Sequence, residues 1–197
     1  MAHEYGTVAD LKERLGIEAI DTSRDAQLTR ALGAATRSIN KTCGRRFWLD
    51  DTPTARVFRL AGKVACEPDG DLLLVDDIGD VTDMVVETGN GSTWTALSDY
   101  ETQPDNALAD GNPVTGLLRN GSWGIYTSRV RITARFGWPA VPDDIGEATA
   151  IQASRLFKRK DSPEGVMGSA EWGVVRLSRR DPDVWNLIEP YLLPGFG

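Results

Sequence analysis

The spacing of apolar residues changes along this chain, and that change limits what the chain can fold into. Between residues 25 and 43, Leu28, Leu32 and Ile39 belong to a set spaced three or four apart, which is one stripe of an α-helix. Residues 129–136 instead alternate apolar and polar side chains, as a strand with one solvated face does. Helical spacing returns after residue 143. We therefore expect an α+β fold, a small helical bundle of N-terminal and C-terminal helices with an inserted antiparallel β module.

Capping residues indicate where the helices begin and end. Thr7 is a good N-cap, and Gly16 and Gly44 suit helix C-termini. Pro142 and the two aspartates after it suit a helix start, because carboxylates are stabilised at the positive end of the helix dipole. The expected helices cover residues 8–15, 25–43 and 143–159, and a last one begins near 181. We expect residues 1–45 to supply the N-terminal helices of the bundle, 46–137 the inserted β module, and 138–197 the C-terminal helices, linker and tail.

Short β-prone runs separated by turn residues fill the middle of the chain. We expect the loop near 104–113 to be irregular and mobile, and residues 162–173 to form a glycine-rich linker. The expected strands are 55–60, 72–75, 81–87, 93–97, 124–126, 129–136 and, after the linker, 174–177.

Charge is distributed unevenly. The 197 residues include 29 acidic and 22 basic side chains, so the chain is a poor candidate for gripping nucleic acid over its whole surface. Residues 50–110 hold 14 acidic and 3 basic side chains, whereas residues 155–180 hold 7 basic and 3 acidic ones. This polarity suits head-to-tail contact between copies, or an acidic partner on the basic segment.

The residue types needed for catalysis are scarce. The single histidine, His3, excludes the usual histidine-based triads, and two cysteines, Cys43 and Cys66, are too few for a zinc cage. The aspartate-rich stretch 69–83 lacks the spacing of a calcium-binding loop, and the glycine patterns that cradle phosphates are absent. We therefore expect no enzyme activity, no catalytic residue, no metal and no cofactor.

The chain start has no apolar signal-peptide core, and the longest apolar run, Leu72–Val75, is far shorter than the ~20 residues of a membrane helix. We expect a soluble protein from a reducing compartment, with no membrane contact. Pairing of the two cysteines stays open.

Candidate contact residues gather near the C-terminal end. Basic residues between 155 and 180 form either a solvated helix end and linker or a contact surface, and protein contact is favoured over DNA by the net acidity. Trp172 either folds back on its own sheet or anchors a neighbouring subunit. The apolar tail is similar to a docking peptide. The candidate interface residues are Trp172, Arg176, Arg179, Arg180, Tyr191, Leu192, Leu193 and Phe196.

Two junction motifs resemble a known family. Residues 34–47, AATRSINKTCGRRF, resemble the A-A-x-x-x-I-x-x-x-C-G-R-x-F helix end of head–tail connector proteins, also called adaptor or head-completion proteins, of long-tailed bacteriophages. Residues 131–145, RITARFGWPAVPDDI, resemble their strand–GWP-x-VP–helix junction. The segments 162–165 and 181–184 follow in the same order. Short members of that family lack the long acidic insertion, so the resemblance implies no partner for it.

The resemblance implies a dodecameric ring beneath the portal protein at the capsid vertex, in the neck of a virion assembled in the host cytoplasm. Such a ring extends the DNA channel toward the tail, with DNA passing through without sequence-specific binding. The implied partners are further copies of the chain, the portal protein and the next tail-side connector or tail protein.

Two alternatives remain open at this stage. One is a tail-completion or tail-terminator protein, which is expected to be mostly strand with one crossing helix. The other is a host-encoded acidic, non-catalytic module that sequesters a basic partner and has no need of the apolar tail.

Overall fold

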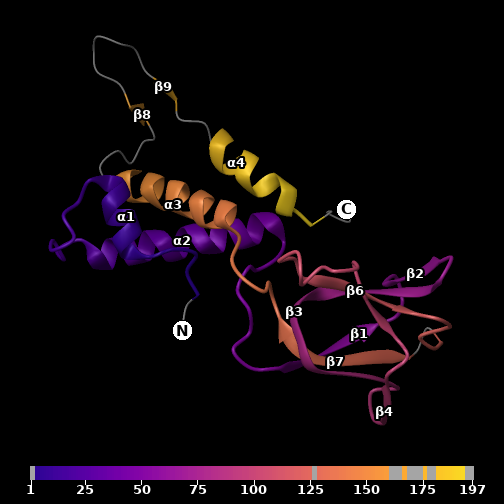
Figure 1. Ribbon diagram of the computed structural model, residues 1–197. Coiled ribbons are helices and arrows are strands. Elements are labelled where there is room, and N and C mark those ends of the chain that lie inside the picture. Colours follow the sequence, from indigo (N-terminus) through magenta and orange to yellow (C-terminus); the bar gives the residue numbers. More distant parts are fainter. Residues whose placement is uncertain (1–2, 126–127, 160–165, 168–174, 177–180, 194–197) are drawn as a thin grey trace. The chain divides into compact units, whose positions relative to one another are not determined.

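The computed structural model describes residues 3–125, 128–159, 166–167, 175–176 and 181–193, and Figure 1 traces the path of the chain. The chain divides into two compact units. Residues 1–45 and 141–197 form the first, here the helical unit, and residues 46–140 form the second, here the β unit. The described helices and the seven-stranded antiparallel sheet confirm the expected α+β class.

The helical unit is held together by the apolar stripes that the sequence shows. Helices α1 (Val8–Leu15), α2 (Asp25–Cys43) and α3 (Asp143–Lys158) pack together, and α4 (Pro182–Ile188) lies along α3. Leu28, Leu32 and Ala35 of α2 are buried, as are Leu11 of α1 and Ala153 of α3. The helix positions follow the predictions closely. No helix in the described ranges is long and apolar enough to cross a membrane.

Local hydrogen bonds set the ends of the first helix and the loop that follows it. The Thr7 hydroxyl accepts from the Asp10 N–H, and the Asp10 carboxylate accepts from the Thr7 N–H, which is a complete capping box. The nearly buried Lys12 ammonium donates to the Ala19 carbonyl and lies 2.6 Å from the Asp25 carboxylate. That ion pair ties the start of α2 to α1.

The β unit contains one sheet whose strand order is β1-β7-β3-β6-β5, with β2 and β4 also paired to β3. All pairs are antiparallel. The strands are β1 (Thr54–Arg59), β2 (Val64–Glu67), β3 (Gly70–Gly89), β4 (Trp94–Leu97), β5 (Glu101–Gln103), β6 (Val114–Arg119) and β7 (Arg129–Phe136). In the helical unit, β8 (Val166–Met167) pairs with β9 (Val175–Arg176).

The long strand β3 belongs to two layers. Its first part pairs with β2 and β6, and its last part pairs with β7 and β4, with register shifts between Leu74 and Val85. Figure 1 shows β2 and β6 on one side of the unit and β7 and β4 on the other, and β1 pairs with β7. One buried cluster joins Leu73 and Leu117 of the first layer to Val86 and Ile132 of the second. The two layers therefore pack face to face, with their outer faces pointing in opposite directions.

Several strand predictions were wrong. The runs 72–75 and 81–87 are parts of one strand, because β3 continues through its irregular middle. Gly124 and Ile125 do not form the strand expected at 124–126, of which residue 126 lies outside the described ranges. Strands β2, β5, β6 and β8 were not predicted, and β8 lies within the linker expected at 162–173. Residues 104–113 form no helix or strand, as expected, but they make hydrogen-bonded turns that bury Ala107 in the core.

The Gly137–Trp138 junction closes onto β3. The Gly137 N–H donates to the Asp77 carbonyl at 2.8 Å, and the indole N–H of Trp138 donates to the Asp77 carboxylate at 3.2 Å. The Trp138 ring lies 5.3 Å from the Phe47 ring, and both side chains are buried. Both ends of the β unit are thus bound to each other where the chain enters and leaves it.

Candidate interaction surfaces

Residues at the end of the described chain pack on their own helical unit. The Tyr191 hydroxyl donates to the Asp144 carboxylate at 3.2 Å, and the Leu193 N–H donates to the Cys43 carbonyl at 3.0 Å. Burial raises the pKa of the Tyr191 hydroxyl, and the nearby Asp144 carboxylate raises it further. Leu192 is half-buried, and Leu193 remains 43% exposed. Of the predicted tail, only Leu193 therefore presents an exposed apolar side chain within the described residues.

Of the other predicted contact residues, the structure describes only Arg176. Arg176 lies in β9, where its backbone pairs with Val166. Trp172, Arg179, Arg180 and Phe196 lie outside the described residues.

Part of the basic segment is neutralised within the helical unit. The Arg155 guanidinium lies 3.1 Å from the carboxylate of Asp181, which also caps α4 by accepting from the Asp183 N–H. Arg155 thus fastens the start of α4 to α3, so its charge has a structural use inside the chain.

Two hollows lie within the helical unit. A small one, of about 100 Å³, lies between α2, α3 and α4 and is lined in part by Ile39, Val184 and Ile188. A larger one, of about 540 Å³, lies beside the N-terminal segment, with apolar lining from Tyr5, Leu11, Leu32, Val141 and Pro142 and an acidic border of Glu4, Asp10, Asp143 and Glu147. Both hollows are lined by residues of the helical unit alone.

The predicted acidic stretch of the β unit is dispersed, not gathered into one site. Asp76 pairs with Arg56 at 2.8 Å and Asp80 with Arg135 at 3.0 Å, while Asp77 accepts from Trp138. Glu67, Asp69 and Asp71 border an open hollow of about 600 Å³ at the β2–β3 turn. Within the described residues, no three His, Cys, Asp or Glu side chains are grouped so as to hold a metal ion.

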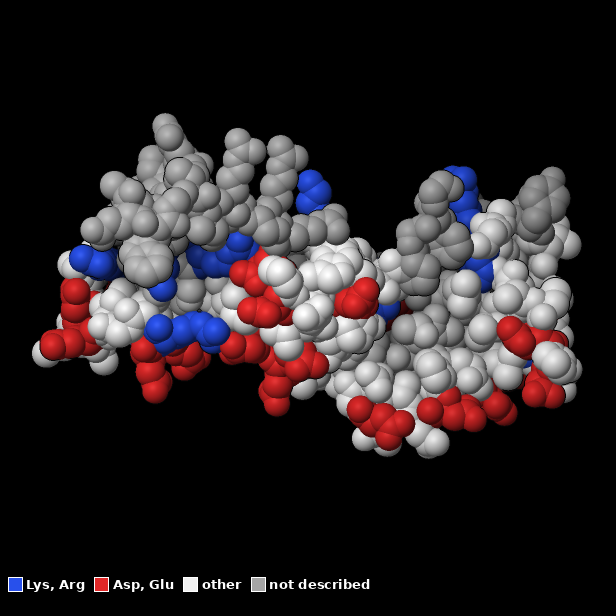
Figure 2. Space-filling view, turned by 90° about the horizontal axis from the view of Figure 1, so that it is seen from above, with Lys and Arg blue, Asp and Glu red and all other residues white. Residues whose placement is uncertain are grey.

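Charged side chains of both signs are exposed on the face of the helical unit shown in Figure 2. The same view shows the β unit as mainly uncharged, with acidic side chains along one margin and a few basic ones away from it. Among the exposed basic residues of α2, Arg30 and Arg37 lie two turns apart on one side of that helix.

Neither cysteine is an activated nucleophile. Burial raises the pKa of Cys43 to about 11. The Asp71 side chain, through a hydrogen bond and its charge, raises the pKa of the exposed Cys66 thiol. Both thiols are therefore protonated near neutral pH, whereas a reactive cysteine needs a lowered pKa. The two are free cysteines and do not pair with each other.

Comparison with known proteins gives a likeness in structure alone. No family model matches the sequence, and no curated protein matches it. The fold is similar to that of a chain in the neck of an empty gene transfer agent (GTA) particle computed with C6 symmetry, with a TM-score of 0.52 and 17% identity over 95% of this chain and 91% of that one. It is also similar to a chain in the virion of the native GTA particle, with a TM-score of 0.51 and 18% identity over the same shares. The fold is shared with GTA particle proteins.

Proposed function

We propose that this chain is a structural protein of the neck of a phage-like particle, where copies form a ring between the portal and the tail. The observation that carries the proposal is the likeness to a GTA neck chain along 95% of this sequence, which includes both the helical unit and the β unit. The junction motifs at residues 34–47 and 131–145 point to the same class of protein.

The ring extends the DNA channel of the particle, and DNA passes through it without sequence-specific binding. A neck computed with C6 symmetry supports a ring whose copy number is a multiple of six, such as the dodecamer that the motifs imply. The net charge of the chain favours free passage of DNA over tight DNA binding. The 29 acidic side chains exceed the 22 basic ones, so few phosphates would be neutralised. The role is structural, needs no catalysis or cofactor, and is carried out in a virion assembled in the host cytoplasm.

The C-terminal residues are the proposed portal contact, with Trp172 and the arginines at 176, 179 and 180 contacting neighbouring copies, and another surface meeting the next tail-side protein. The described tail residues narrow this proposal. Tyr191 and the backbone of Leu193 are already bonded within their own unit, whereas the Leu193 side chain is 43% exposed, so among the described tail residues the Leu193 side chain is the proposed contact. Phe196 remains part of the proposal.

The test is a deletion in the strain that produces the particle. Without the chain, we expect heads and tails to accumulate unjoined, and a plasmid copy should restore joined particles. A copy that ends at Leu193 keeps both internal bonds and separates loss of portal contact from loss of folding: it should remain folded yet fail to restore joining. Normal particles in the complete deletion would refute the proposed function.

A further inference from the structure

The outer face of the second layer of the β unit combines exposed valines with arginines. Val57 is 50% exposed and Val85 is 45% exposed. Strand alternation and register place Arg59, Arg129 and Arg131 on this same outer face, because Phe58, Val130 and Ile132 point into the core. The name valine–arginine face is used below for Val57, Arg59, Val85, Arg129 and Arg131.

Two of these arginines are opposed to each other. Arg59 and Arg129 face each other directly across β1 and β7, and neither has an ion pair within the described residues. Like charges directly opposite in an antiparallel pair destabilise the sheet. Arg131 differs, since its guanidinium lies 2.6 Å from the Glu87 carboxylate and 4.5 Å from the Trp94 ring centroid. The Arg59–Arg129 pair is therefore a positive site that an anionic partner would stabilise.

The first layer has an outer face of the opposite charge. Leu72 and Leu118 face each other there and are half-buried, and Leu74 is 42% exposed. Glu101 lies opposite Leu118 on the edge strand β5, and Glu67 is exposed at the end of β2. These five residues are called the leucine–glutamate face below. The sequence has no Lys, Arg or His from residue 64 to residue 118, so no basic side chain of this segment neutralises that face.

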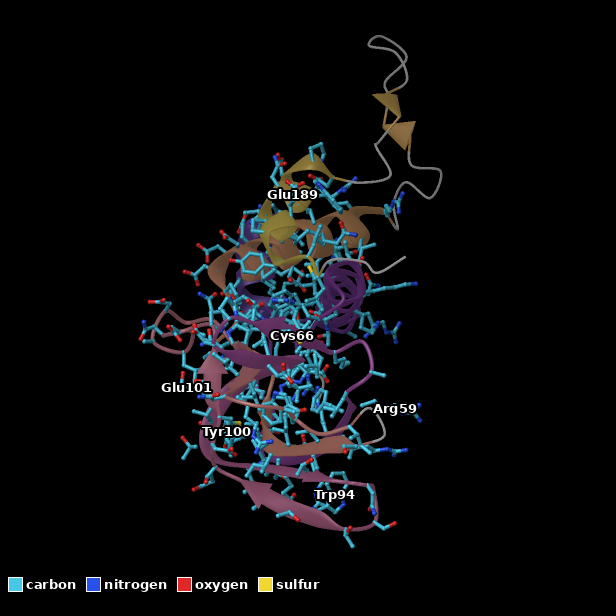
Figure 3. All side chains as sticks on the ribbon, turned by 90° about the vertical axis from the view of Figure 1, so that its right-hand side faces the viewer. Arg59, Cys66, Trp94, Tyr100, Glu101 and Glu189 are labelled. Carbon is cyan, nitrogen blue, oxygen red and sulfur yellow. The ribbon has the colours of Figure 1, made fainter. Side chains whose placement is uncertain are left out.

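The two faces lie on opposite sides of one compact unit. They are the outer surfaces of two layers that share a single core, and Figure 3 shows Arg59 and Glu101 extending to opposite sides of the β unit. Each face has an apolar centre and charges that form no ion pair with the described residues (Arg59 and Arg129 on one face, Glu67 and Glu101 on the other), the composition of a protein contact. Phosphates would gain nothing from the exposed valines, which disfavours DNA as the occupant.

We propose that the valine–arginine face of one copy packs against the leucine–glutamate face of the next copy. This interface rests on the proposed ring function and adds to it the surfaces through which neighbouring copies meet. The contact is heterologous, because different surfaces of the two copies meet, and such contacts close into rings when the rotation between copies allows it. It places Arg59 and Arg129 against Glu67 and Glu101 and buries Val57 and Val85 against Leu72 and Leu74.

Cysteine crosslinking of the full chain tests this contact. The background is Cys66→Ser, which leaves only the buried Cys43. In that background, Val57→Cys with Leu74→Cys places one thiol on each face, and mild oxidation should give a ladder of dimers, trimers and larger species on a denaturing gel. Each single variant should give no species beyond a dimer. The absence of a ladder, or a chain that stays monomeric in low salt at the highest attainable concentration, overturns the proposal.

Charge reversal tests the same contact independently. Arg59→Glu with Arg129→Glu should remove the ladder, and adding Glu67→Arg with Glu101→Arg should restore it. The matched control reverses the exposed Arg30 and Arg37 of α2 and should leave the ladder unchanged. Circular dichroism checks that each variant is folded.

The outcomes separate this interface from the proposed function. Particles that still incorporate the Arg59→Glu, Arg129→Glu chain at the wild-type ratio would show that the ring closes through other surfaces, which overturns the interface and leaves the neck function standing. A wild-type chain missing from particles would overturn the neck function itself. A valine–arginine face protected by added DNA, but not by a second copy, would also overturn the interface.

Discussion

Replacing Gly137 with alanine is expected to destabilise the β unit severely, because this glycine lies against another part of the backbone. Its φ angle is +116°, which side chains with a Cβ rarely adopt. A Cβ atom at this position would overlap the carbonyl oxygen of Trp48 and lie 2.8 Å from the carbonyl carbon of the same residue. These are backbone atoms, so no side-chain rotation can relieve the overlap.

The magnitude follows from two costs. Backbone strain of this kind costs about 1–3 kcal/mol. Forcing extra atoms into a packed site adds about 1–3 kcal/mol, so we expect a total of roughly 4 kcal/mol. Gly111 is the matched control in the same unit: its φ is +74°, but nothing lies within 4 Å of the added Cβ. Gly111→Ala should therefore cost only the left-handed strain of about 1 kcal/mol.

Urea unfolding measures both variants. Buried Trp123 and Trp138 report on the β unit by fluorescence, and far-ultraviolet circular dichroism reports on the helices. With a slope of about 1 kcal/mol per molar urea, Gly111→Ala should lower the fluorescence midpoint by about 1 M and Gly137→Ala by about 4 M. Equal shifts for the two variants would refute the reasoning, since both have positive φ and the close approach to the Trp48 backbone is found only at Gly137.

Three further results are expected. At pH 8 the exposed Cys66 should react with a thiol reagent while Cys43 does not, because a pKa of about 11 leaves roughly one thiolate in a thousand; equal rates would contradict the burial. Thr7→Ala should cost about 1 kcal/mol by urea unfolding of the helical unit, through loss of the capping box, and no change would contradict that role. The hydrogen bond from Arg131 lowers the pKa of Glu87, so this pair stabilises the fold above the ordinary pKa of 4.5 and the stabilisation is lost as pH falls through the lowered value. Glu87→Gln should therefore make stability less dependent on pH in that acidic range, as urea midpoints at neutral and acidic pH would show.

The helices were predictable because each is specified by residues close together in sequence. The stripe from Leu28 to Ile39 and the cap at Thr7 are local signals, and the structure follows both. Tertiary contacts determine only which neighbouring helix packs on the apolar stripe.

The strands were less predictable because their pairing is not local. Strand β3 continues past Asp76 and Asp77, polar residues that suggest a break, because the register shifts allow each part to pair with a different neighbour. Strand β6 contains Gly116, which weakens its signal, yet that glycine lies directly opposite Leu74 in the pair. No local pattern specifies such partners.

The candidate surfaces were also only partly predictable, because they depend on non-local pairing. The alternation in residues 129–136 predicted that Arg129 and Arg131 share a solvated face. That Arg59 faces Arg129 depends on the register of β1 against β7, which the sequence does not reveal. The Tyr191–Asp144 bond was likewise hidden, because it joins residues 47 positions apart.

The most direct test of the central claim is the ratio of this chain to the portal protein in purified particles, measured by quantitative mass spectrometry. The account predicts that the chain is present at about one copy per portal subunit, as a ring stacked on the portal requires. Its absence from the particles would contradict the neck assignment.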